Sequence, residues 1–435
     1  MKKIYIIGLM ACTMAACKTN IEPSKPDKGS ADFTRYVAVG NSLTAGFADG
    51  SLYKSGQENS YPSILAGQFK LVGGGNFKQP LLPGNFGYPG AKLTLQMVQG
   101  ACDATSSLAP AYFKGALDTA GSAMSVAQDG PYNNMGVPGI RCIDFLFRGY
   151  GMLNPYARRF YVDPAGSRPA DEAGVLHPTF FTMWIGANDV LGYATAGGDG
   201  SSDPTAKISD PNLFAVAYDT TLSIMRRNGA QGVLINIPDV TAIPFFTTIP
   251  ANGLTLTQDD AYRLNDAYNN VPGIRFQAGA NYFLIADASA PAKFRHIQPG
   301  EYILLSLPMD SVKCAGWGTK KPIPANYVLT AGEVANIQTA TSAYNQIISR
   351  LAQRENLAVV DLNSYLRTLQ SGILFNGVAF NTTFVSGGAF SLDGVHLTPR
   401  GYALVANQII NTINNRYNAT IPQVDVNKYN GVLFP

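Results

Sequence analysis

Histidine and cysteine are scarce in this chain of 435 residues, which contains three histidines and five cysteines. The spacings CxxC and HExxH, which are typical of zinc sites, do not occur in it. Without such a set of ligands, the sequence predicts neither a structural nor a catalytic metal site.

Charge is also sparse, since 14% of the residues are Asp, Glu, Lys or Arg and the formal net charge is +3. No stretch is rich in arginine or lysine, so the sequence predicts no nucleic-acid partner. The hydrophobic fraction of 46% fits a globular protein with a large core, and 44 glycines together with 22 tyrosines indicate long loops.

The N-terminal apolar run, residues 4–14, is shorter than the ~20 residues that a transmembrane helix needs. Two lysines precede it, and Met14-Ala15-Ala16-Cys17 follows it and resembles a bacterial lipobox. We therefore predict a signal peptide over residues 1–16, cleavage before Cys17 and attachment of lipid to that cysteine.

Residues 17–30 are rich in Pro, Lys and Ser and are predicted to form a flexible tether between the lipid and the folded domain. Such an anchor places the protein at the cell envelope, and we expect it on the outer membrane. Export also exposes the remaining cysteines, Cys102, Cys142 and Cys314, to an oxidising environment. One disulfide is then expected; the sequence leaves the pairing open, and Cys102–Cys142 is the pair we favour.

Short apolar runs alternate with segments of helical periodicity along residues 31–417, which predicts an α/β fold. Continuous apolar runs are typical of parallel strands that are covered on both faces. The expected strands are 36–40, 179–185, 232–237 and 357–361, and the expected helices are 211–228, 257–268, 330–355 and 398–413. We therefore predict a three-layer α/β/α sandwich with a mostly parallel central sheet.

Two stretches, about 50–130 and 241–330, depart from this alternation and are rich in Gly, Pro, Asn and aromatic residues. We expect them to be long loop insertions that cover one end of the sheet. Residues 418–435 are predicted to be a C-terminal tail.

Ser42 follows the first expected strand, two residues after Gly40. A serine at this place, where a strand gives way to a helix, is suited to nucleophilic attack because the glycines let a substrate approach. The alternative is that Ser42 only caps the helix.

Asp393 and His396 lie three residues apart, just before Thr398 and Pro399 open the last expected helix. This spacing allows the carboxylate to bind one ring nitrogen of the imidazole and leaves the other free to accept a proton from a hydroxyl. The alternative is a loop cap beside a surface histidine.

Two further stretches contain candidate oxyanion donors. Gly139 offers a backbone N–H without a side chain in the way, although the stretch also fits an ordinary turn, and Gly136 is an alternative. Asn188 follows a buried strand, where its side-chain amide is able to donate to a developing negative charge; it also fits an Asx turn.

These four stretches, in this order, resemble the sequence blocks of the GDSL or SGNH hydrolases, from about residue 36 to residue 415. The resemblance implies that Ser42 is the nucleophile, His396 the base and Asp393 the residue that orients it. It also implies an oxyanion hole made of the Ser42 and Gly139 N–H groups and the Asn188 side chain. Asn41 stands where the family name has aspartate.

The resemblance implies a serine esterase that acts through an acyl-enzyme and requires no cofactor. Its substrate would be an ester, either of a lipid acyl chain or of an acetylated carbohydrate. Apolar residues at 244–246 and 302–307 favour an acyl channel, whereas the Asn and Tyr residues of the insertions suit sugars. A non-catalytic ligand-binding lipoprotein and an acyltransferase are the alternative functions.

Overall fold

The computed structural model describes residues 25–102, 105–201 and 203–435. The predicted signal peptide, Cys17 and most of the predicted tether lie outside these residues. None of the helices within the described ranges has both the length and the apolar character needed to cross a membrane.

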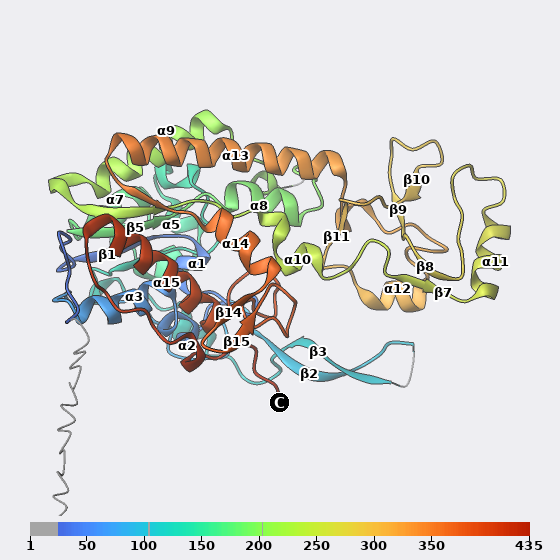
Figure 1. Cartoon of the computed structure of the whole chain (residues 1–435), viewed down its shortest axis with the longest axis horizontal. Coiled ribbons are helices and arrows are strands. Elements are labelled where there is room, and N and C mark those ends of the chain that lie inside the picture. The colour runs from blue at the N-terminus through green and yellow to red at the C-terminus, as the bar shows by residue number, and fades with distance from the viewer. Residues whose placement is uncertain (1–24, 103–104, 202) are drawn as a thin grey trace, which may run out of the picture.

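A five-stranded parallel sheet forms the centre of the protein (Figure 1). Its order is β13 (Ala358–Val360), β6 (Gln231–Ile235), β5 (Phe180–Trp184), β1 (Tyr36–Gly40) and β4 (Asn134–Gly136). Every residue of β1 and β5 is buried, which explains their continuous apolar sequence.

The carboxyl ends of β1 and of its two neighbours, β4 and β5, are level with one another. Gly40 at the end of β1 pairs with Gly136 in β4 on one side and with Trp184 in β5 on the other. The segments that follow these strands therefore emerge together at one edge of the sheet, where open α/β folds bind ligands.

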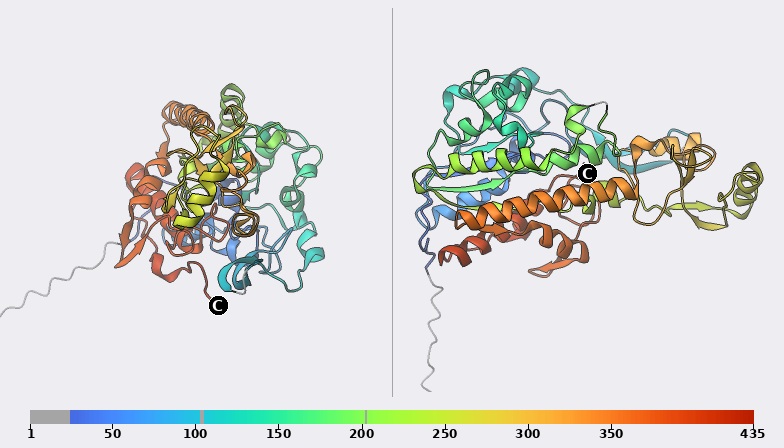
Figure 2. Two further views of the ribbon diagram at one scale, coloured as in Figure 1. Left: turned by 90° about the vertical axis from the view of Figure 1, so that its right-hand side faces the viewer. Right: turned by 90° about the horizontal axis from the view of Figure 1, so that it is seen from above.

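Helices cover both faces of the sheet, as the sequence predicts (Figures 1 and 2). On one face α9 (Pro211–Met225) packs against α13 (Ala331–Arg354), and on the other α3 (Tyr61–Lys70) packs against α15 (Pro399–Tyr417). The structure is thus a three-layer α/β/α sandwich.

Side-chain caps fix the starts of the three long helices. Asp210 accepts two backbone N–H groups at the start of α9, and Thr330 forms a capping box with Glu333 at the start of α13. Thr398 accepts the Gly401 N–H at the start of α15, which continues to Tyr417, four residues beyond its predicted end.

The remaining helices and strands are short. The helices are α1 (Ser42–Ala45), α2 (Lys54–Glu58), α4 (Thr119–Ala123), α5 (Tyr150–Leu153), α6 (Pro155–Phe160), α7 (Pro169–Gly174), α8 (Asn188–Thr195), α10 (Pro244–Thr247), α11 (Gln258–Ala267), α12 (Met309–Ala315) and α14 (Leu362–Ser371). The paired strands are β2 (Leu93–Gln99) with β3 (Ser106–Tyr112), β7 (Leu254–Leu256) with β8 (Gly279–Asn281), β9 (Leu284–Ala286) with β10 (Phe294–His296), β11 (Tyr302–Ile303) with β12 (Val328–Leu329), and β14 (Ile373–Phe375) with β15 (Val378–Phe380).

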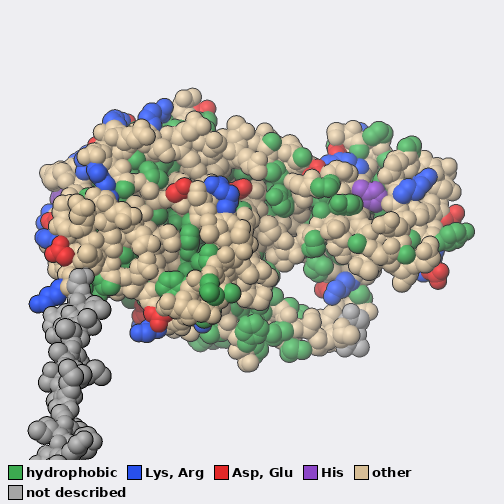
Figure 3. All heavy atoms as spheres, in the orientation of Figure 1, with side chains coloured by type: hydrophobic (Ala, Val, Ile, Leu, Met, Phe, Trp, Pro, Cys, Tyr) green, Lys and Arg blue, Asp and Glu red, His purple; other side chains and the backbone are tan. Residues whose placement is uncertain are grey.

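Two projections extend from the sandwich. The β2–β3 ribbon leaves the lower side in Figure 1, and the segment from β7 to α12, which we call the distal lobe, extends at the right. The distal lobe has small hydrophobic clusters, one of them around Ile285 and Ile303 and another around Leu264 and Phe276. In Figure 3 an open gap separates the ribbon from the distal lobe above it, and charged side chains are scattered over this face.

A disulfide joins the two projections. Cys102, at the end of the ribbon, is bonded to Cys314 in α12, with the Cα atoms 5.7 Å apart. The predicted pair Cys102–Cys142 is therefore wrong. Cys142 is a free, fully buried thiol in the core, where its Sγ lies 3.7 Å from the carbonyl oxygen of Phe214.

Candidate active site

Ser42 lies directly beyond the end of β1 and begins the short helix α1. The turn requires glycine at position 40, because a Cβ there would lie 1.8 Å from Thr44 Oγ1 and 2.8 Å from the Trp184 carbonyl oxygen. Asn41 caps α1 by accepting the Leu43 N–H at 3.0 Å. The cap is thus supplied by Asn41, and the Ser42 hydroxyl is left free to face His396.

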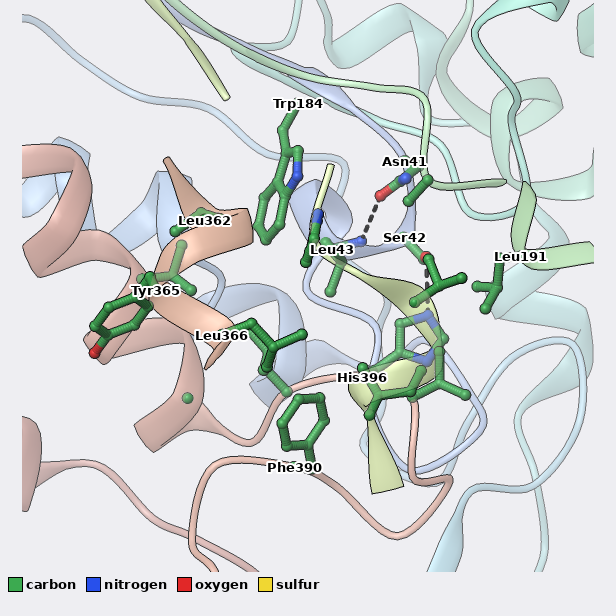
Figure 4. Close-up of a pocket in the computed structure, with 18 of the residues that line it drawn as sticks. Asn41, Ser42, Leu43, Trp184, Leu191, Leu362, Tyr365, Leu366, Phe390 and His396 are labelled. Atoms are coloured by element: carbon green, nitrogen blue, oxygen red, sulfur yellow. Dashed lines mark hydrogen bonds between the residues drawn. The ribbon is translucent and has the colours of Figure 1, made fainter. Parts of the chain in front are cut away.

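Ser42, His396 and Asp393 form one chain of hydrogen bonds. His396 Nε2 lies 2.9 Å from Ser42 Oγ, a contact drawn in Figure 4. His396 Nδ1 lies 2.8 Å from Asp393 Oδ2. The structure therefore brings together the serine and the Asp–His pair, which are more than 350 residues apart in the sequence.

Asp393 is held in place as a carboxylate. Burial raises its pKa, but the neighbouring His396 and the backbone N–H groups of Val395 and His396, which donate to Oδ1, bring the pKa well below its usual range. Asp393 is therefore ionised at neutral pH and is able to stabilise a protonated imidazole.

A second set of contacts to Asp393 was missed by sequence reasoning. The Gly50 N–H donates to Asp393 Oδ2 at 2.8 Å, and the Ser391 hydroxyl donates to Oδ1 at 3.1 Å. Asp49 accepts the Leu392 N–H at 3.0 Å, so the turn at Asp49–Gly50 holds the loop that contains Asp393. An Asp-Gly pair indicates a turn, but nothing in the sequence shows which distant loop the turn contacts.

The partly buried carboxylate of Asp49 has a further partner in Tyr53, whose hydroxyl donates to it at 2.7 Å. Burial raises the pKa of Asp49, and this hydrogen bond opposes the rise. Asp49 does not contact Ser42 or His396 in this network, and its effect on them runs through the 391–393 loop.

Asn188 and Gly139 lie at the carboxyl ends of the strands on either side of β1. The Asn188 side chain donates to the Ile140 carbonyl oxygen at 2.9 Å, which ties it to the loop that contains Gly139. Gly139 has a φ of 82°, which favours glycine. Asn188 lines the same pocket as Ser42 and His396, whereas Gly139 lies outside that pocket's lining.

The two candidate oxyanion donors, Gly139 and Gly136, differ in whether their backbone N–H groups are free. The Gly136 N–H is engaged, because it donates to Asn134 Oδ1 at 3.0 Å. Among the described residues, no protein acceptor binds the backbone N–H of Ser42 or of Gly139. These two N–H groups are therefore available to an external oxygen.

Asp189 fixes the base of the Gly139 loop, because it accepts the Cys142 N–H at 2.6 Å. The side chain is fully buried, and burial raises its pKa to about 7. The sequence marks Asp189 only as a neighbour of Asn188; its partner in the core is visible only in the fold.

An apolar pocket opens beside Ser42 and His396 and extends toward α14 (Figure 4). Within the part of the chain that the structure describes, no group of three or more His, Cys, Asp or Glu side chains is placed to hold a metal ion. The polar groups at the site are the Ser42 hydroxyl, the His396 imidazole, the Asp393 carboxylate and the free N–H donors.

Solved structures that are similar to this chain include two distant ones. A mutant of Axe2, an acetyl-xylooligosaccharide esterase from Geobacillus Stearmophilus, is 10% identical with a TM-score of 0.34, covering 88% of this chain and 95% of its own. A putative GDSL-like lipase from Parabacteroides merdae is 12% identical with a TM-score of 0.34, covering 89% of this chain and 99% of its own. No curated protein matches the chain.

The family model described as GDSL-like Lipase/Acylhydrolase matches residues 36–409, which runs from the first residue of β1 into α15. The match includes Ser42, Asn188, Asp393 and His396 within one continuous span. The chain belongs to the GDSL-like lipase/acylhydrolase family.

Proposed function

We propose that the protein is a carboxylic ester hydrolase in which Ser42 is the nucleophile, His396 the general base and Asp393 the group that orients His396. The observation that supports this proposal is a pair of hydrogen bonds, one between Ser42 Oγ and His396 Nε2 and the other between His396 Nδ1 and Asp393 Oδ2. A serine hydroxyl is a weak nucleophile, and a base held in this way activates it.

In the reaction, Ser42 Oγ attacks the ester carbonyl carbon while His396 Nε2 accepts the hydroxyl proton. His396 then gives this proton to the departing alcohol oxygen, which leaves an acyl group on Ser42. Water attacks the acyl-enzyme in a second, equivalent cycle and releases the carboxylic acid. The ionised Asp393 stabilises the imidazolium in both cycles.

The oxyanion of each tetrahedral intermediate would accept hydrogen bonds from the N–H groups of Ser42 and Gly139 and from the Asn188 amide. The two N–H groups have no protein acceptor among the described residues, and one hydrogen of the Asn188 amide remains beyond its bond to Ile140. A pre-placed donor of this kind contributes about 3–4 kcal/mol in acyl transfer.

The location of the enzyme rests on the sequence of residues 1–17 alone. The charged start, the short apolar run and the lipobox-like Met14-Ala15-Ala16-Cys17 support a lipid-anchored protein of the cell envelope. We propose outer-membrane attachment through Cys17.

Substitution Ser42→Ala tests the proposal. We expect hydrolysis of p-nitrophenyl butyrate to fall by at least about 10³-fold in kcat, because the nucleophile is lost while the fold is kept. Ser349→Ala is the matched control, because Ser349 is an exposed serine of α13 away from the site. Wild-type turnover by the Ser42→Ala protein would show that Ser42 is not the nucleophile, and no turnover by the wild type would favour a ligand-binding protein.

A further inference from the structure

The pocket beside Ser42 is apolar over nearly all of its length. Its polar lining includes Asn41, Ser42, Asn188 and His396. The other lining residues include Trp184, Ile243, Leu362, Leu366, Leu369 and Phe390.

Helix α14 forms one wall of the pocket. Leu362, Leu366 and Leu369 follow one another at intervals of four and three residues, so they share one face of the helix, and all three are buried. Figure 4 shows Leu362, Tyr365 and Leu366 together on the side of the pocket away from Ser42. The pocket therefore extends from Ser42 to α14, and Leu404 and Val405 of α15 also line it.

Tyr365 contributes the one phenol among the described residues that line the pocket. The Tyr365 hydroxyl lies toward Gln408 of α15, and burial raises the pKa of Tyr365 to about 12. A sugar bound here would have to leave its hydroxyl groups without partners, which is unfavourable in a buried site. An alkyl chain has no such groups and gains from leaving water.

The insertions, whose Asn and Tyr residues suit sugars, contribute little to this pocket. Ile243 is the one lining residue from 241–330, and no residue from 50–130 lines it. Residues 244–246 and 302–307, which the sequence suggests as an acyl channel, do not line it either. Residues of α14 and α15 line the pocket instead.

We propose that this pocket binds the acyl chain of the substrate, so that the enzyme acts on esters of unbranched fatty acids many carbons long and discriminates against acetyl esters. The inference rests on the proposed function, because the pocket matters for catalysis only if Ser42 is acylated. With the acyl carbonyl at Ser42 and the oxyanion donors, the chain lies along Phe390 and the α14 leucines.

A series of p-nitrophenyl esters from acetate to palmitate tests this directly. Each methylene placed in the pocket adds up to about fourfold to kcat/KM until the pocket is filled, since transfer from water favours each one. Leu366→Trp fills the space next to α14, so we expect the decanoate-to-acetate ratio of kcat/KM to fall at least tenfold. Leu369→Phe, a smaller change, is expected to reduce the ratio in the same direction and is informative if Leu366→Trp does not fold.

Leu374→Phe is the matched control, because Leu374 is an exposed leucine of β14 outside the pocket, and its ratio should equal that of the wild type. A wild-type rate that is flat or falls from acetate onward would overturn the inference, as would faster release of acetate from acetylated xylan than hydrolysis of any fatty-acyl ester. In those cases the esterase activity itself would still stand. Failure to hydrolyse every ester would instead contradict the proposed function.

Discussion

The two sides of Ser42 differ in chemical character. On one side, His396, Asp393 and the turn at Asp49–Gly50 are joined by hydrogen bonds between 2.7 and 3.1 Å. On the other side, the pocket that extends to α14 is lined almost wholly by hydrocarbon. We therefore expect substitutions on the polar side to lower the rate for every ester. Substitutions on the apolar side should alter which ester is preferred.

The largest effect on the polar side is expected from Asp393→Asn. The amide is unable to stabilise the imidazolium as a carboxylate does and favours the wrong ring tautomer, so kcat should fall by about 10⁴-fold for acetate and decanoate esters alike. Steady-state kinetics on both esters measure this, with Asp259→Asn in the exposed start of α11 as the control. A loss confined to one acyl length would contradict the division between the two sides.

The environment of Asp393 also allows a prediction about the pH dependence of activity. Because the pKa of Asp393 lies well below its usual range, this carboxylate stays ionised as the pH falls from neutral. Protonation of Asp393 should therefore not contribute to the loss of activity toward acid, and log(kcat/KM) should fall with a slope of about one. A wild-type profile of log(kcat/KM) that falls with a slope of about two would show that a second group titrates.

A smaller effect is expected from Asp49→Ala, because Asp49 acts on the reaction only by positioning the Asp393 loop. Loss of its bonds to the Leu392 N–H and the Tyr53 hydroxyl should lower kcat about tenfold to a hundredfold and leave KM nearly unchanged. Asp49→Asn keeps an oxygen for the Leu392 N–H and should recover much of the loss. A change in KM alone, or no recovery with asparagine in a protein of normal melting temperature, would rule out this positioning role.

Much of the fold could be predicted because it depends on local patterns. The buried strands β1, β5, β6 and β13 are continuous apolar runs, and the long helices start at recognisable caps. Strand β4 is three residues long and has no such run, so its place in the sheet depends on pairing with β1, and on the Asn133 amide that donates to the Tyr36 carbonyl oxygen.

The site could be predicted where its parts are close in sequence or follow a strand end. Asp393 and His396 lie three residues apart, and Ser42 and Asn188 each follow a buried strand. The contact between Asp49 and Leu392 joins residues 343 positions apart, and the Cys102–Cys314 bond joins residues 212 apart. Such pairings are determined by the three-dimensional arrangement and leave no local pattern.

The pocket could not be predicted from the sequence, because it too depends on the three-dimensional arrangement of distant segments. Leu362, Leu366 and Leu369 have the spacing of any helix face that packs against a core, and the sequence does not reveal that this face borders an open space beside Ser42. Only the positions of α14 and α15 relative to the carboxyl end of β1 distinguish a binding wall from ordinary core packing.

Covalent labelling is a direct test of whether Ser42 is an activated nucleophile. A fluorophosphonate reacts with serines that a base has activated, and the modified peptide is identified by mass spectrometry. We expect one label per chain, on Ser42, with no label on Ser42→Ala and much slower labelling of His396→Ala. An unlabelled wild-type protein, or a label on another serine, would show that Ser42 is not the activated nucleophile.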